Sequence, residues 1–208
     1  MYVRASAFAR QVAWIKERWQ IRTLGDALSH PPAADASPVV ALTFDDGWRD
    51  NLVHAWPVLQ AQGVRATIFL VKEWVAAGSN RHGEFLDPRD VRTLAAEGME
   101  FGAHTVTHAK LDRIDLRSAE EEMRCSKTAV EKWSGRPCDL FAYPLGLHNP
   151  EAVALARRIF RGSTLAGGGW WTPGSDPSQI PRINVHQNMS STTSLFAATL
   201  AFAARHPK

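Results

Sequence analysis

Two adjacent carboxylates, Asp45 and Asp46, follow an apolar run at residues 39–42 that reads as a buried strand. Gly47 comes next and permits the backbone angles of a sharp exit turn. A carboxylate pair at the end of a core strand is costly unless a cation or good hydrogen bonds compensate its charge. Because Asp-Asp-Gly is also ordinary turn chemistry, the pair alone indicates either a capped turn or a cation site.

Two imidazoles, those of His104 and His108, follow a second short apolar segment at residues 99–103. Two imidazoles and one carboxylate form a facial triad that leaves open positions on a divalent metal. Three protein ligands plus water are also the pattern of catalytic zinc. The His-x-x-x-His spacing is a weak signal alone, but together with Asp45 and Asp46 at another strand end it predicts a catalytic metal site.

Three motifs, in this order, resemble those of the metal-dependent polysaccharide deacetylases, the NodB-homology or carbohydrate esterase 4 family. Residues 43–47 are similar to the first family motif, residues 104–108 to its His-Ser/Thr-x-x-His motif, and residues 141–146 to its third motif in the exopolysaccharide-deacetylase variant. The resemblance covers nearly the whole chain. It implies an α/β fold, a distorted and incomplete (β/α) barrel, with one catalytic domain over residues 1–208 in which residues 1–37 form an N-terminal helical lead-in.

The resemblance also implies roles for individual residues. Asp46, His104 and His108 would hold the metal, and Asp45 would act as the general base. The backbone amide of Tyr143 would help to bind the developing oxyanion. Zinc (Zn2+) suits these ligands best, and their softness and geometry also allow cobalt, nickel, manganese or iron.

Two positions depart from the family pattern. Many members carry an arginine where Ala142 stands, and that arginine orients the base. Arg182, near the end of the last expected strand, is either its substitute or an ordinary structural arginine. The general acid of the family is a histidine in a Leu-x-His motif, whereas this chain has Asn184-Val185-His186. His186 is therefore the candidate acid, and without it the protonation step is unassigned.

Aromatic residues near the motifs are candidates for contact with a carbohydrate. Trp170 and Trp171 follow three glycines and form either a sugar-stacking platform or a packing anchor for their loop. Trp48, directly after the aspartates, has the same two interpretations. We expect Trp48, Tyr143, Pro144 and Trp171 to line the substrate site.

The predicted function is that of a metal-dependent N-deacetylase acting on acetylated amino sugars of a polysaccharide or its precursor. Such a reaction needs an activated water, an electrophile at the acetyl carbonyl, a base, and an acid for the leaving amine. The same residues would serve an O-acetyl esterase or a hydrolase of a small amide. An inactive carbohydrate-binding protein is a further alternative, which the presence of Asp45 and all three ligands disfavours.

The composition fits one globular enzyme domain. The chain has 208 residues, of which 45% are hydrophobic, enough for one sizeable core. Its net charge of +3 is not clustered, so nucleic-acid binding is not expected. The sequence has no apolar run of membrane-spanning length, and its N-terminus lacks the apolar core of a signal peptide, so we expect a cytoplasmic protein unless the sequence is part of a longer or exported one. Cys125 and Cys138 are expected to be free thiols, and the sequence does not indicate the oligomeric state.

Strands alternate with helices along the chain, which favours parallel β/α architecture but does not distinguish a barrel from an open sheet. Apolar, β-branched runs predict strands at residues 39–42, 66–71, 99–103, 140–142, 163–166 and 180–185. Periodicity, caps and glycine stops predict an N-terminal helix and helices at residues 51–62, 87–98, 149–160 and 194–204. A capping-box pattern at residues 118–121 predicts the start of another helix, and residues 74–84 are expected to be a loop.

Overall fold

Six parallel strands form the main sheet of the chain in a computed structural model that describes residues 3–33, 35–77, 84–172 and 174–205. Their order across the sheet is their order in the sequence, so the chain winds in one direction, as in a (β/α) barrel. Between the first and last of these strands no ladder closes the sheet within the described residues. The fold is therefore the predicted incomplete barrel. Its strands are β3 (Thr43–Phe44), β4 (Thr67–Leu70), β5 (Glu100–Ala103), β6 (Leu140–Ala142), β7 (Gly162–Gly168) and β8 (Ile180–Arg182).

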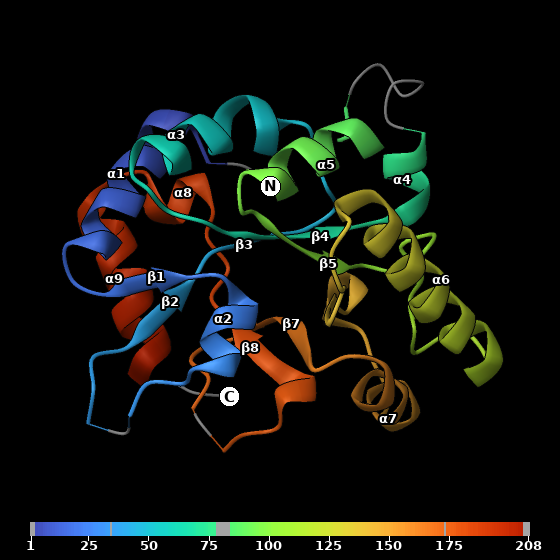
Figure 1. Cartoon of the computed structure of the whole chain (residues 1–208). Coiled ribbons are helices and arrows are strands. Elements are labelled where there is room, and N and C mark those ends of the chain that lie inside the picture. The colour runs from blue at the N-terminus through green and yellow to red at the C-terminus, as the bar shows by residue number, and fades with distance from the viewer. Residues whose placement is uncertain (1–2, 34, 78–83, 173, 206–208) are drawn as a thin grey trace.

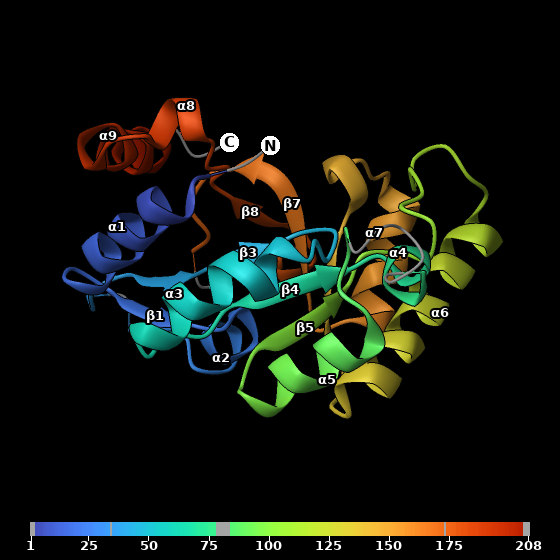
Figure 2. The same cartoon turned by 90° about the horizontal axis from the view of Figure 1, so that it is seen from above.

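Helices cover the outer face of this curved sheet. α5 (Pro88–Ala96), α6 (Leu116–Ser134) and α7 (Pro150–Ile159) pack one beside the next (Figure 1). At the other side α1 (Ala5–Lys16) lies between α3 (Trp56–Ala61) and α9 (Thr193–Arg205), which Figure 2 shows from above. The other elements are β1 (Gln20–Arg22), α2 (Leu24–Ser29), β2 (Val39–Ala41), the π-helical turn η1 (Asn51–Ala55), α4 (Lys72–Ala76), the short helices η3 (Pro144–Gly146) and η4 (Pro177–Gln179), and α8 (Gln187–Ser190).

None of the helices in the described part of the chain combines the length and the apolar character that crossing a membrane would require.

The hydrophobic core has an outer layer under the helices and a smaller layer inside the curve of the sheet. Strand β4 is buried at all four residues, because a parallel strand with both faces covered is apolar throughout. Ile68 and Leu70 point to the outer layer, and Phe69 points to the inner one. The same alternation places Phe141 outside and Ala142 inside. The strands therefore hold their ends rigidly, and the functional side chains follow those ends.

Two predicted helix starts are confirmed, and one is wrong. Asp87 accepts hydrogen bonds from the first turn of α5, and Asn149 caps α7. The capping box predicted at Ser118 does not form, because α6 begins earlier. Asp115 is its cap and accepts the backbone N–H of Ser118 at 3.0 Å. Asp115, three residues upstream, is therefore the N-cap. Ser118 lies inside the first turn of the helix and does not cap it.

Three other boundaries differ from the prediction. A loop was expected at residues 74–84, but α4 extends through residue 76 and so includes the start of this segment. Residues 78–83 lie outside the described part. The last strand ends at Arg182 rather than at residue 185, because its partner β7 ends at Gly168, which pairs with Arg182. Of the run at residues 39–42, residues 39–41 form β2 of the separate two-stranded sheet, the main sheet begins only at Thr43, and the run is half-buried rather than buried.

Candidate active site

The predicted site residues lie at the carboxyl ends of the parallel strands. Asp45 and Asp46 follow β3, His104 follows β5, Tyr143 follows β6, and Arg182 ends β8. Parallel strands present their carboxyl ends at one edge of a sheet, which is the catalytic face of a barrel. The topology thus brings these five residues to the same edge.

The turn after β3 has a left-handed backbone at two successive residues. Asp46 has φ 72° and Gly47 has φ 76°. Glycine suits this position, because a Cβ on Gly47 would lie 2.8 Å from a methyl carbon of Leu70. For Asp46 the conformation costs about 1–2 kcal/mol. The surrounding structure must offset that cost, and the Gly47 carbonyl accepts the N–H of Leu86 at 2.9 Å. The turn therefore directs consecutive carboxylates to different neighbours.

Asp46, His104 and His108 form a group that could hold a metal ion. One ligand atom of each lies within 4.8 Å of the others. Asp46 Oδ1 is 3.5 Å from Nε2 of His104 and 3.5 Å from Nε2 of His108. His104 Nδ1 donates a hydrogen bond to the carbonyl of Ala142 at 2.7 Å, so its Nε2 is left as the acceptor that can ligate. This donor set fits a divalent cation with open positions.

The protonation states of this group also suit a metal. Burial raises the pKa of Asp46, but the nearby imidazole of His104 and the indole N–H of Trp48 outweigh it, so the net pKa lies below its usual range. Burial lowers the pKa of His108, and the nearby imidazole of His104 lowers it further, against the opposing effect of Asp46. A charged carboxylate and a neutral imidazole are the forms that bind metals.

Asp45 makes a two-point ion pair with Arg182. The guanidinium nitrogens lie 2.7 Å from Oδ1 and 2.8 Å from Oδ2 of the carboxylate. Arg182 is itself fixed, because its Nε donates to the carbonyl of Leu165. Burial raises the pKa of Asp45, but the charge and hydrogen bonds of Arg182 outweigh it, so the net pKa lies below its usual range. The arginine predicted as a candidate partner of the base thus contacts that base directly.

An aromatic stack borders the metal group. Trp48 stacks on Phe85 with ring centroids 4.5 Å apart, Phe85 meets Trp74 at 5.0 Å, and Trp74 stacks on His108 at 5.0 Å. The indole N–H of Trp48 donates to Asp46 Oδ2 at 3.1 Å. The stack therefore joins two of the three candidate ligands. The predicted contact of Trp48 with substrate stays a prediction, and its exposed fraction of 42% leaves room for one.

The roles predicted for Tyr143 and Pro144 are contradicted by their surroundings. The backbone N–H of Tyr143 donates to the carbonyl of Thr164 at 3.1 Å, so it is not free for an oxyanion. The phenol hydroxyl donates to the carbonyl of Ser178 at 2.9 Å, and the side chain is fully buried. Burial raises the pKa of this phenol. Pro144 is buried too, so neither side chain lines an exposed substrate site.

Leu145, the next residue of this turn, has the features that Tyr143 lacks. Its backbone is left-handed with φ 57°, and its side chain is 58% exposed. Among the described residues its N–H has no hydrogen-bond acceptor. The third motif therefore offers one free amide at the carboxyl end of β6, two residues beyond the predicted position.

The remaining predicted residues are not brought to the metal group by any described contact. His186 precedes α8, and its carbonyl accepts the hydroxyl of Ser190 at 2.6 Å; its role as acid stays a prediction. Trp171 packs against the inner core layer. Trp170 donates to the Leu200 carbonyl at 3.3 Å and meets Trp19 edge-on at 5.9 Å. These contacts favour the packing-anchor interpretation of the loop, and stacking of Trp171 on a sugar stays a prediction.

Glu122 and Trp74, which contact the candidate ligands or their loop, were not predicted from the sequence. Glu122 in α6 bonds the loop between the two histidines, and Trp74 in α4 stacks on His108. Glu122 is one of several glutamates on an amphipathic helix, and no local pattern marks it. Trp74 lay in a predicted loop.

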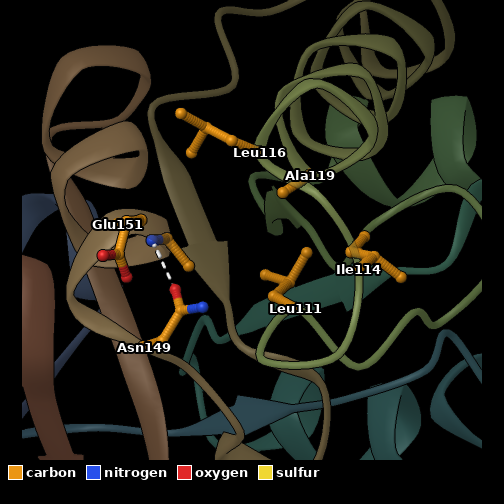
Figure 3. A pocket seen from close by; sticks show the side chains of 7 residues that line it. Leu111, Ile114, Leu116, Ala119, Asn149 and Glu151 are labelled. Atoms are coloured by element: carbon orange, nitrogen blue, oxygen red, sulfur yellow. Dashed lines mark hydrogen bonds between the residues drawn. The ribbon is translucent and has the colours of Figure 1, made fainter.

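A separate small pocket lies between α6, α7 and the loop that follows His108 (Figure 3). Its volume is about 90 Å³, and Leu111, Ile114 and Leu116 form its apolar side. The Asn149 oxygen at this pocket already accepts the N–H of Ala152 at 2.8 Å, the bond drawn in Figure 3. The pocket contains none of the metal group.

Comparisons with known proteins agree with this geometry. The polysaccharide deacetylase family model matches residues 33–159. The putative polysaccharide deacetylase YxkH of Bacillus subtilis (strain 168) is 29% identical over 119 residues, which are 57% of this chain and 41% of that protein. The chain spans less than half the length of the curated relatives that it matches.

Solved structures share the whole fold. The Streptococcus pyogenes deacetylase PplD, solved in complex with acetate, superimposes with a TM-score of 0.84 and 25% identity over 95% of this chain and 87% of that one. A putative polysaccharide deacetylase from Bacillus anthracis superimposes with a TM-score of 0.82 and 25% identity over 95% of this chain and 62% of that one. With a family model that matches more than half of its residues, this chain belongs to the polysaccharide deacetylase family.

Proposed function

We propose that this protein is a metal-dependent hydrolase that removes acetyl groups from N-acetylated amino sugars of a polysaccharide or its precursor. One observation carries the proposal: two consecutive carboxylates are divided between two tasks. Asp46 faces both histidines at 3.5 Å, and Asp45 faces Arg182 instead. A capped turn would not need this division, whereas a hydrolase with a metal and a separate base does.

Asp46, His104 and His108 would hold the cation, which we expect to be zinc by the chemistry of its ligands. When bound, the cation supplies an activated water and polarises the acetyl carbonyl. Cobalt, nickel, manganese and iron also tolerate this ligand set.

Asp45 would take the proton from the attacking water. A carboxylate has about four acceptor positions, and Arg182 uses two of them, so the base keeps capacity for a proton. One third of its side chain (33%) is exposed, which lets a water or a substrate reach it. Arg182 keeps Asp45 ionised at neutral pH and fixes its orientation.

The free N–H of Leu145 would donate to the oxygen that becomes negative as the acetyl carbonyl is attacked. It replaces the Tyr143 amide, which already bonds Thr164. A fixed backbone donor is effective here because it requires no reorganisation during the reaction. We assign protonation of the leaving amine to His186, which follows the carboxyl end of β8 by four residues.

Acetate release from a substrate panel tests the reaction class. The purified protein, loaded with Zn2+ or Co2+, is given N-acetylglucosamine oligomers, O-acetylated xylan and a small N-acetyl amide, with Asp45→Asn as the matched inactive control. The proposal predicts acetate from the N-acetylated oligomers and little from the others. Acetate from xylan alone would identify an O-acetyl esterase, and binding of oligomers without any acetate release would identify an inactive carbohydrate-binding protein.

A further inference from the structure

The loop that carries both candidate histidine ligands has an unfavourable backbone. Thr105 has φ 68° and His108 has φ 63°, which are left-handed conformations at residues other than glycine. Such residues keep this conformation only where their surroundings over-determine it. The His104–His108 loop is therefore held by contacts from outside itself.

One carboxylate, that of Glu122, makes three of these contacts. Glu122 Oε2 accepts the backbone N–H of Val106 at 2.7 Å and that of Thr107 at 3.0 Å. Glu122 Oε1 accepts the Thr107 hydroxyl at 2.9 Å. Three donors from the centre of the loop thus converge on the two oxygens of one side chain. Hydrogen bonds to a charged acceptor are stronger than neutral ones.

The opposite side of the loop is bonded as well. The backbone N–H groups of Lys72 and Glu73 donate to the carbonyls of Thr105 and Val106 at 3.1 and 3.0 Å. Because Val106 is bonded on both sides, the loop is fixed between the start of α4 and the second turn of α6.

The backbone of Glu122 is held firmly in place by α6. Its neighbour Met123 is fully buried, and its own carbonyl accepts the hydroxyl of the buried Ser126 at 2.7 Å. A long helix packed on the core therefore supports the carboxylate. Glutamine replaces it incompletely, because its single oxygen can accept only the two backbone N–H groups, its N–H2 group then faces the Thr107 hydroxyl, and it carries no charge.

We propose that Glu122 is a positioning residue that sets the distance and orientation of His104 and His108, and thereby the metal affinity of the site. This inference rests on the metal-dependent function proposed above. Glu122 touches neither the metal group nor the reacting atoms. It acts on the ligands through the loop, and groups that orient ligands in this way typically change metal affinity by about 10- to 100-fold.

The test measures the dissociation constant for Zn2+ and Co2+ by competition with a coloured chelator. The variants are Glu122→Gln and, as the matched control on the same helix, Glu120→Gln, which removes only a surface ion pair with Arg124. The inference predicts about 10- to 100-fold weaker metal binding for Glu122→Gln and wild-type binding for Glu120→Gln. The visible spectrum of bound Co2+ should change in Glu122→Gln, because the arrangement of the ligands changes.

Thermal unfolding of the metal-free variants distinguishes a positioning role from a purely structural one. A structural role would lower the melting temperature of Glu122→Gln and leave the dissociation constant and the Co2+ spectrum unchanged, and that result would overturn the inference. If Glu122→Gln does not fold, Thr107→Val decides, since it removes only the exposed hydroxyl donor. Unchanged affinity in Thr107→Val would then overturn the inference, and weakened affinity would support it. Absence of metal binding in the wild type would instead refute the proposed function itself.

Discussion

The carboxylate of Asp45 and the guanidinium of Arg182 join the two edge strands of the sheet, β3 and β8, from positions 137 residues apart in the sequence. The backbones of these strands are not paired with each other, so the ion pair bridges the open side of the barrel. Arg182 is almost buried, with 12% of its side chain exposed. The same contact thus links the two edge strands and holds the proposed base. Ala142, the position at which many family members carry an arginine, supplies no charge for this purpose.

Replacing Arg182 by methionine should shift the pH dependence of the reaction. In the wild type burial raises the pKa of Asp45, but Arg182 lowers it, and the net pKa lies below its ordinary value. Without the arginine only the smaller effects of His104 and His108 oppose burial, so the pKa of the proposed base rises and the acid limb of kcat/KM moves to higher pH. We expect kcat/KM at neutral pH to fall about 10- to 100-fold. Arg158→Met, at an exposed position of α7, is the control and should keep the wild-type profile. An unshifted acid limb in Arg182→Met would contradict the pairing.

Replacing Asp45 by asparagine should separate catalysis from metal binding. Asp45 lies outside the group of candidate ligands, so Asp45→Asn should retain about one metal ion per chain. Its kcat should fall about 10²- to 10⁴-fold, the usual contribution of a general base. Asp46→Asn, the same change one residue later, should lose the metal. Elemental analysis and acetate release on both variants check this, and loss of metal from Asp45→Asn would show that the roles are assigned wrongly.

Replacing Trp48 by phenylalanine should weaken metal binding more than substrate binding. The change removes the N–H that holds Asp46 Oδ2 and keeps an aromatic ring that can stack on Phe85. We expect the dissociation constant for Zn2+ to rise about 10-fold with little change in KM. Trp14→Phe, in α1, is the control. A raised KM with unchanged metal affinity would support the alternative, that Trp48 contacts the substrate.

Replacing Tyr143 by phenylalanine should affect stability and not catalysis. The hydroxyl of Tyr143 donates to the Ser178 carbonyl, and both residues are buried, so the variant leaves that carbonyl without this donor. The free energy of unfolding should fall by about 1–2 kcal/mol. Denaturant unfolding and kcat/KM measured on the same samples check this. A large loss of kcat/KM at unchanged stability would return Tyr143 to the site.

The grouping of Asp46, His104 and His108 could be predicted from the sequence because their signals are local. Each follows an apolar run, and parallel strands bring the ends of such runs to one edge. The partner of Asp45 could only be given as one of two interpretations of Arg182, since the contact crosses the open side of the barrel.

Two of the errors have the same origin. The backbone N–H of Tyr143 bonds the carbonyl of Thr164, where β6 pairs with β7. The register of that pairing cannot be predicted from the sequence. Glu122 was missed because its partners lie 15 and 16 residues away in a loop without a pattern of its own. Long-range hydrogen bonds account for these two errors, whereas Trp74 was missed because its segment was predicted as a loop and is part of α4.

In the proposed function, Asp46, His104 and His108 hold the metal on which deacetylation depends. The most direct test of this role is acetate release from N-acetylglucosamine oligomers by the wild type before chelation, after chelation, and after return of Zn2+ or Co2+, with the double variant His104→Ala and His108→Ala treated in parallel. We predict release that chelation abolishes and metal restores in the wild type, and no restoration in the double variant. Release that persists after complete metal removal, or that the double variant recovers, would contradict this account.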